Sequence, residues 1–138
     1  MITNSDNDAA GLLLGKIGEQ AFKITLVGLG IQIPQEGMLH DFVTAKSYAN
    51  VYRILYNASY LDRVYSQKAL DLLSKSTFPG LTASLPAGTI VAHKFGERSE
   101  QSKQLHDCGI VYYPKHPYLL CIMTRGGNAE VLSKAIGS

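Results

Sequence analysis

The chain has 138 residues and a mass of 15.0 kDa, of which 46% are hydrophobic and 17% charged, so it can bury a core of its own and is neither disordered nor fibrous. Its 13 basic and 11 acidic residues are scattered along the length, and the formal charge of +2 excludes nucleic acid as an expected partner. The longest apolar runs, Leu12–Leu14 and Tyr118–Met123, fall far short of the roughly 20 residues of a membrane-spanning helix, and we expect a soluble segment.

The first 78 residues carry mainly helical patterns. The apolar residues of Asp8–Lys16 follow a Ser-Asp-Asn cluster that suits a helix cap, and a short second helix is predicted over Gln20–Leu26. Gly and Pro residues then predict an irregular loop over Ile31–Leu39. Helical spacing of apolar residues resumes from a Thr44 cap to near Asn57, and again from a Ser66 cap to Leu73.

Four tyrosines recur at four-residue spacing along the third predicted helix and just beyond its end: Tyr48, Tyr52, Tyr56 and Tyr60. Residues at this spacing share one face of a helix, which is more typical of a packing stripe than of a ligand platform. We expect them in the core or at an interface.

Residues 79–138 change to a strand pattern. Three short runs rich in β-branched and aromatic residues predict strands, namely Ile90–Lys94, Gly109–Tyr113 and Tyr118–Thr124. Pro114 and Pro117 bracket a turn, which makes the last two runs an antiparallel hairpin. A helix over Ala129–Ile136 closes the chain. The prediction is one α+β unit over residues 1–138, a helical region followed by a three-stranded antiparallel sheet and a C-terminal helix.

Cys108 and Cys121 are the only cysteines, and they lack the spacing of a zinc site. We expect no metal and no cofactor. A hairpin turning near Lys115 and His116 would leave the two cysteines about two residues out of register, which favours buried free thiols over a cross-strand disulfide.

Two short clusters carry the chemistry: Ser5-Asp6-Asn7 before the first helix, and Lys94-Phe95-Gly96 at the end of a strand. In this order they resemble two motifs of the serine penicillin-recognising enzymes, the class A β-lactamases and D,D-peptidases, which carry S-x-x-K, S-D-N and K-T-G. The segments Leu85–Gly88, His106–Tyr112 and Pro117–Thr124 extend the resemblance over nearly the whole chain. It implies a partial β-lactamase or transpeptidase-like fold.

The resemblance also implies roles for individual residues. Ser5 would relay a proton to the leaving nitrogen, and Lys94 would hold the substrate carboxylate and lower the proton affinity of Ser5. Asn7 would bind the substrate amide, whereas Asp6 is expected to tie down the local backbone. Further substrate contacts would come from the residues that follow Lys94. Phe95 and Gly96 would lie beside the substrate, and the backbone N–H of Glu97 would donate to the oxyanion.

The family's nucleophile is missing, since no serine lies three residues before any of the nine lysines. We therefore expect an amino-truncated piece whose missing N-terminal half supplies the nucleophile, with a pseudoenzyme as the alternative. Phe95 replaces the usual Thr or Ser of the K-T-G motif, which deletes a charge-assisted hydrogen bond worth about 1.5–3 kcal/mol. Glu36, in an E-x-x-L-H stretch, is the candidate for the deacylating base.

Two other positions complete the candidate site. His93 alternates with Lys94 along the strand, which predicts that its side chain points to the opposite face in a structural role. His106 and Asp107 begin the next strand, where a place at the pocket rim and a capping or strand-end role are both open.

The sequence therefore predicts the C-terminal part of a serine hydrolase that acts on β-lactams or cell-wall peptides through an acyl-enzyme and is inactive alone. The alternative is a noncatalytic binding module that holds peptidoglycan fragments or a partner protein. The resemblance implies a periplasmic or extracellular location. An uncovered sheet edge predicts self-association as a homodimer, by edge pairing or domain swapping.

Overall fold

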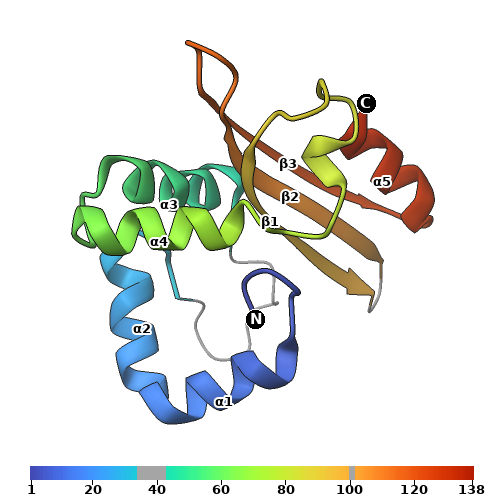
Figure 1. The fold of residues 1–138 in the computed structure, drawn as a ribbon. Coiled ribbons are helices and arrows are strands. Elements are labelled where there is room, and N and C mark those ends of the chain that lie inside the picture. Colours follow the sequence, from blue (N-terminus) through green and yellow to red (C-terminus); the bar gives the residue numbers. More distant parts are fainter. Residues whose placement is uncertain (34–42, 100–101) are drawn as a thin grey trace.

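A computed structural model of the chain describes residues 1–33, 43–99 and 102–138, and confirms the predicted α+β architecture (Figure 1). Its elements are α1 (Asn7–Ile17), α2 (Glu19–Gly28), α3 (Ala45–Asn57), α4 (Arg63–Leu73), the short 3-10 helix η1 (Gly80–Thr82), β1 (Val91–Ser99), β2 (Lys103–Val111), β3 (Tyr118–Gly126) and α5 (Ala129–Gly137). The three strands form an antiparallel sheet in the order β1-β2-β3.

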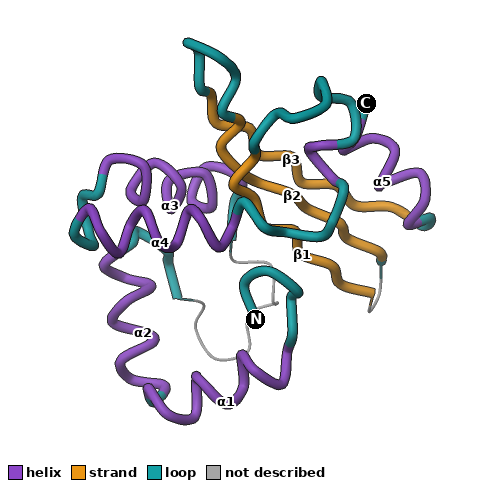
Figure 2. Tube along the Cα trace, viewed as in Figure 1, coloured by secondary structure: helices purple, strands orange, loops and turns teal. Residues whose placement is uncertain are grey.

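The sheet lies between two helical layers (Figures 1 and 2). Helices α3 and α4 cover one face, and α5 with η1 covers the other. A buried cluster around Tyr52, Ala92 and Ile110 fills the first interface, and a second cluster around Val91, Val111 and Ile136 fills the other. Because successive side chains of a strand alternate between faces, Ala92 and Val91 belong to different cores.

The strand register corrects the prediction for the cysteines. Cys108 on β2 lies directly opposite Cys121 on β3, and the two are joined by a disulfide. The hairpin turns one residue earlier than its prolines suggest, and a one-residue shift of the turn moves the cross-strand pairing by two residues. Lys94 on β1 is the partner of Cys108, so Lys94, Cys108 and Cys121 form one row across the sheet.

The start of α4 also differs from the prediction. Asp62 is the N-cap, and its side chain accepts a hydrogen bond of 2.9 Å from the Tyr65 backbone N–H. Ser66 lies inside the helix, buried, and donates to the Leu61 carbonyl. Aspartate and serine are about equally good at the N-cap position of a helix, and the hydrogen bond of such a side chain to a free backbone N–H stabilises the helix by about 1 kcal/mol.

The first two strands are longer than the apolar runs that predicted them. Strand β1 continues to Ser99 and β2 begins at Lys103, because backbone pairing extends through polar residues at the end of the pair where β1 leads into β2. Backbone hydrogen bonds need no apolar side chain, so the pattern of buried residues marks only the covered part of each strand.

Helices α1 and α2 form an arm that stands away from the sheet and its two helical layers (Figure 1). Neither contributes a buried residue, although both are rich in large apolar side chains. Leu12 is 77% exposed, and Ile24 and Val27 are each 62% exposed. Of the helices that the structure describes, none has the length and apolarity to cross a membrane.

Candidate functional site

The segment before α1 brings Ser5 to the edge of the sheet. Ile2 packs against the core under α3 and α4, and the Thr3 hydroxyl donates to the Leu72 carbonyl of α4 at 3.3 Å. Asp6 caps α1 by accepting from the Ala9 backbone N–H at 2.8 Å, as expected of a residue that ties down the backbone. Ser5 is thus held on both sides.

Ser5 itself adopts a left-handed backbone conformation, with φ at 51°. A non-glycine residue in this region carries a cost of about 1–3 kcal/mol, and it persists only where the surroundings fix it. Strained residues of this kind gather at functional sites, which adds weight to Ser5 as a candidate.

The Lys94 ammonium group meets Ser5 across 89 residues of sequence. Its Nζ donates to the Ser5 Oγ at 2.7 Å and to the Phe95 carbonyl at 3.0 Å. The same nitrogen lies 4.4 Å from the centre of the Phe95 ring, within the range of a cation–π interaction. A short segment before the first helix and an edge strand of the sheet therefore build one polar site.

Partial burial and a nearby carboxylate set the charge of this site. Burial lowers the pKa of Lys94, and the negative charge of Asp107 opposes that shift. An ammonium group that donates to a hydroxyl stabilises the deprotonated form of that hydroxyl, and desolvation strengthens the effect. This arrangement can move a proton through the Ser5 oxygen.

The other predicted site residues lie near the pair in different ways. Asn7 is the exposed first residue of α1, and Gly96 and Glu97 follow Lys94 along β1. Phe95 packs against the core on the α5 side of the sheet, where its ring stacks on Phe78 with centres 4.3 Å apart. Glu36 lies outside the described residues.

His93 and Asp107 form a buried pair on the face opposite Lys94, as strand alternation predicts for His93. The His93 Nδ1 lies 2.9–3.0 Å from the two Asp107 carboxylate oxygens, and the Leu81 backbone N–H donates to Asp107 at 2.9 Å. Both side chains are almost inaccessible to solvent. Asp107 therefore joins η1 to the sheet from inside the core and is not at a pocket rim.

A largely apolar hollow of about 660 Å³ opens between the end of α2, helix α3 and the sheet, and neither Ser5 nor Lys94 lines it. Its walls include Leu29, Tyr48 and Met123, and Gly96 and His106 stand at its sheet side. The His106 Nδ1 accepts from the Thr124 backbone N–H at 3.2 Å, which fixes the ring at this rim. Of the two roles that the sequence left open for His106, the structure favours the one at the rim of a hollow.

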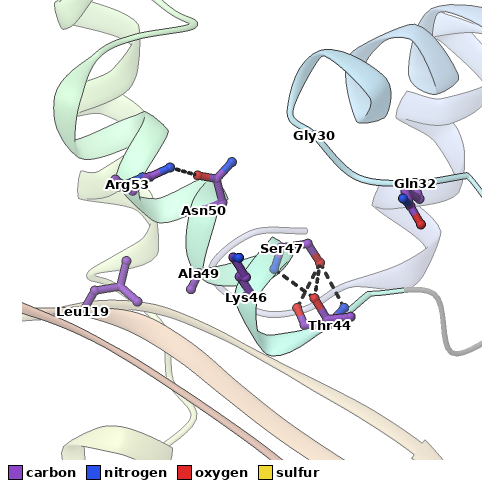
Figure 3. A pocket seen from close by; sticks show the side chains of 9 residues that line it. All are labelled: Gly30, Gln32, Thr44, Lys46, Ser47, Ala49, Asn50, Arg53 and Leu119. Carbon is purple, nitrogen blue, oxygen red and sulfur yellow. Dashed lines mark hydrogen bonds between the residues drawn. The ribbon is translucent and has the colours of Figure 1, made fainter.

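A second hollow of about 700 Å³ lies between α3, the segment after α2 and Leu119 of β3, and it is more polar (Figure 3). Lys46 and Arg53 line it, and Arg53 donates to the Asn50 side chain at 2.6 Å. None of the predicted site residues that the structure describes lines it. Among the described residues there is also no group of three or more His, Cys, Asp or Glu side chains that could hold a metal ion.

Comparisons with known proteins show the family and the fold of the chain. The sequence model of a family described as the β-lactamase enzyme family matches residues 1–138. The chain belongs to this family. A search of curated proteins found no match.

Solved structures of the β-lactamase family share the fold. An engineered variant of the last common ancestor of Gram-negative class A β-lactamases is 26% identical, with a TM-score of 0.83 over 99% of this chain and 57% of its own. The structure named PBP-A is 22% identical, with a TM-score of 0.82 over 99% of this chain and 54% of its own.

A class A β-lactamase from Bacteroides cellulosilyticus is 21% identical, with a TM-score of 0.80 over 96% of this chain and 56% of its own. The chain thus spans a little more than half the length of these structures. The fold class and the family resemblance expected from the sequence are confirmed.

Two residues named in the sequence analysis, Tyr48 and Asp107, act on Lys94 in a way that the sequence did not predict. The Tyr48 hydroxyl of α3 donates to the Lys94 carbonyl at 3.3 Å, and Asp107 supports the charge of Lys94 from the other face of the sheet. The tyrosine spacing predicts a packed helix face, but which strand residue that face meets depends on how α3 lies across the sheet.

Proposed function

We propose that this chain is the C-terminal part of a β-lactamase-like serine hydrolase that acts on β-lactams or cell-wall peptides through an acyl-enzyme. The observation that carries the proposal is the 2.7 Å hydrogen bond from Lys94 to Ser5. In this role Ser5 relays the proton to the leaving nitrogen, and Lys94 binds the substrate carboxylate and favours loss of the Ser5 proton.

Three other residues would complete the substrate contacts. Asn7 binds the substrate amide, Gly96 allows the substrate to approach the strand, and the Glu97 backbone N–H stabilises the oxyanion. Glu36 is the proposed deacylating base. Phe95 supplies a ring where the family has a hydroxyl, which weakens carboxylate binding by the loss of one charge-assisted hydrogen bond.

The nucleophile would come from polypeptide outside these 138 residues, because no S-x-x-K occurs among them. Two features of the fold support a covering segment. The arm of α1 and α2 exposes large apolar side chains, and the apolar hollow that Tyr48 and Gly96 line has room for further side chains. The matched structures have over two-fifths of their length beyond the part that this chain spans, which is enough for such a segment.

Alone, the chain should bind a substrate without turning it over. Removal of the nucleophile from a comparable serine protease costs roughly six orders of magnitude in rate. We therefore expect no hydrolysis of a chromogenic cephalosporin and no covalent labelling by a fluorescent penicillin. Hydrolysis of the cephalosporin or covalent labelling by the penicillin would show that the chain has a nucleophile of its own and would overturn this part of the proposal.

Substrate binding can be tested separately with benzylpenicillin and NMR. Chemical-shift changes should centre on Ser5 and Lys94, weaken in Lys94→Ala, and persist in the control Lys103→Ala, whose lysine is exposed at the start of β2. Shift changes that are the same in both variants, or absent from the wild type, would refute the assignment of Lys94.

A noncatalytic binding module is the second candidate, favoured by the missing S-x-x-K and by Phe95. It would hold peptidoglycan fragments or a partner protein along β1. An in-frame serine followed three residues later by lysine in the DNA upstream of Met1 would support the hydrolase. A muropeptide that binds at Lys94, in a protein whose full reading frame lacks that motif, would support the module.

A further inference from the structure

Helix α3 contacts the site at the backbone of Lys94. The Tyr48 Oη donates to the Lys94 carbonyl at 3.3 Å, 46 residues away along the chain. The ammonium group of the same residue donates to Ser5. Lys94 is thus held by its main chain from α3 and by its side chain from the segment before α1.

Tyr52, one helical turn after Tyr48, belongs to the same contact. Their ring centres are 5.8 Å apart, and Tyr52 interacts with both the Tyr48 hydroxyl and the Lys94 backbone. Burial raises the pKa of both tyrosines, so each hydroxyl keeps its proton and remains a donor.

The helix that carries these tyrosines is itself fixed. Thr44 and Ser47 form a reciprocal capping box at its start, and Tyr52 is only 2% exposed in the core between α3 and the sheet. A donor on a rigid helix restricts the peptide to which it binds, and this restriction extends to the direction of the attached side chain.

We propose that Tyr48, supported by Tyr52, is a positioning residue that orients Lys94 toward Ser5. The inference rests on the proposed function, in which these two groups share a proton, but the contact itself can be tested without any catalytic assay. Tyr48 also lines the apolar hollow, so whatever fills that hollow contacts the residue that positions Lys94.

Loss of the Tyr48 hydroxyl should free Lys94 and leave the fold intact, because phenylalanine keeps the ring. In Tyr48→Phe, the Lys94 ammonium protons should exchange with water about two- to tenfold faster, the effect of losing one hydrogen bond. The Lys94 pKa should rise toward its ordinary value as the side chain gains water, since burial is the main cause that lowers it.

The experiment is NMR of lysine side chains labelled with ¹³C and ¹⁵N, with Lys94 assigned by Lys94→Arg. Tyr56→Phe is the matched control, because Tyr56 lies two turns beyond Tyr48 on α3, is half exposed, and its ring contacts that of Tyr112. Lys94 signals that are unchanged in Tyr48→Phe, or changed equally in Tyr56→Phe, would overturn the proposal. Unchanged benzylpenicillin binding in a Tyr48→Phe protein with altered Lys94 signals would instead count against the proposed function.

A measurement on the unsubstituted protein covers the case in which Tyr48→Phe does not fold. With ¹³Cζ-labelled tyrosine in an equal mixture of H₂O and D₂O, a slowly exchanging hydroxyl gives two resolved lines. Tyr48 should give two lines and the exposed Tyr56 one. A Tyr48 hydroxyl that exchanges as fast as that of Tyr56 would also overturn the proposal.

Discussion

Asp107→Ala should be among the most destabilising single substitutions in this chain. The Asp107 carboxylate is fully buried and accepts from the Leu81 backbone N–H at 2.9 Å and from the His93 Nδ1. Because an ionised carboxylate can only accept, the His93 nitrogen that faces it is the donor. One side chain thereby satisfies two buried donors, one on η1 and one on β1.

The magnitude follows from what the substitution leaves behind. Each unpaired buried donor costs about 1–3 kcal/mol, so the free energy of unfolding should fall by about 2–6 kcal/mol. That is a large part of the roughly 5–15 kcal/mol that stabilises a typical domain. The approach of η1 to this carboxylate also depends on Gly80, because a Cβ there would collide with it.

Urea denaturation followed by circular dichroism measures this loss. Asp71→Ala is the control, since the Asp71 carboxylate is exposed and accepts from the Gln67 side chain on the same helix, and the substitution should change stability by no more than about 0.5 kcal/mol. Asp107→Asn keeps the shape and removes the charge, so it should lower the Lys94 pKa further, because that charge opposes the effect of burial. A loss in Asp107→Ala no greater than in Asp71→Ala would refute the reasoning.

Four further predictions concern packing, pH, the disulfide and assembly. Gly109→Ala should lower the free energy of unfolding by about 1–3 kcal/mol, because the new Cβ would lie 2.5 Å from the His93 Cβ. The control Gly11→Ala adds a Cβ in open space on α1 and should be neutral or stabilising. Equal midpoints of the two variants in thermal melts would contradict this prediction. Burial raises the pKa of Tyr52 in the folded protein, so above about pH 10 this tyrosine loses its proton only on unfolding, and the free energy of unfolding should fall as the pH rises. In urea titrations at a series of pH values, Tyr52→Phe should show a smaller fall. Equal slopes of stability against pH for the two proteins would count against this reasoning. Reduction of the Cys108–Cys121 disulfide, which closes a separation of 13 residues, should lower the free energy of unfolding by up to about 3 kcal/mol, and an unchanged urea midpoint with reductant would disprove a stabilising role. Unpaired edges on β1 and β3 in the described sheet should allow dimers to form at high concentration, whereas light scattering after size exclusion that shows only monomer would exclude edge pairing.

The sequence alone determined the order and type of the elements and the two clusters that hold the candidate site. Helical spacing located α3, and the change to β-branched runs located the sheet, because both periods are set by the backbone geometry of a single element. The motifs that contain Ser5 and Lys94 were recognisable for the same reason, since each lies within one short stretch of chain.

Only the tertiary structure decided which residues meet. The cysteine pairing depended on a one-residue difference in a turn, and the Asp107 contacts depended on where η1 lies against the sheet. The bond from Tyr48 to Lys94 required the placement of α3 across β1. These contacts join elements that are far apart in the chain, and packing between elements leaves no period in the sequence of either partner.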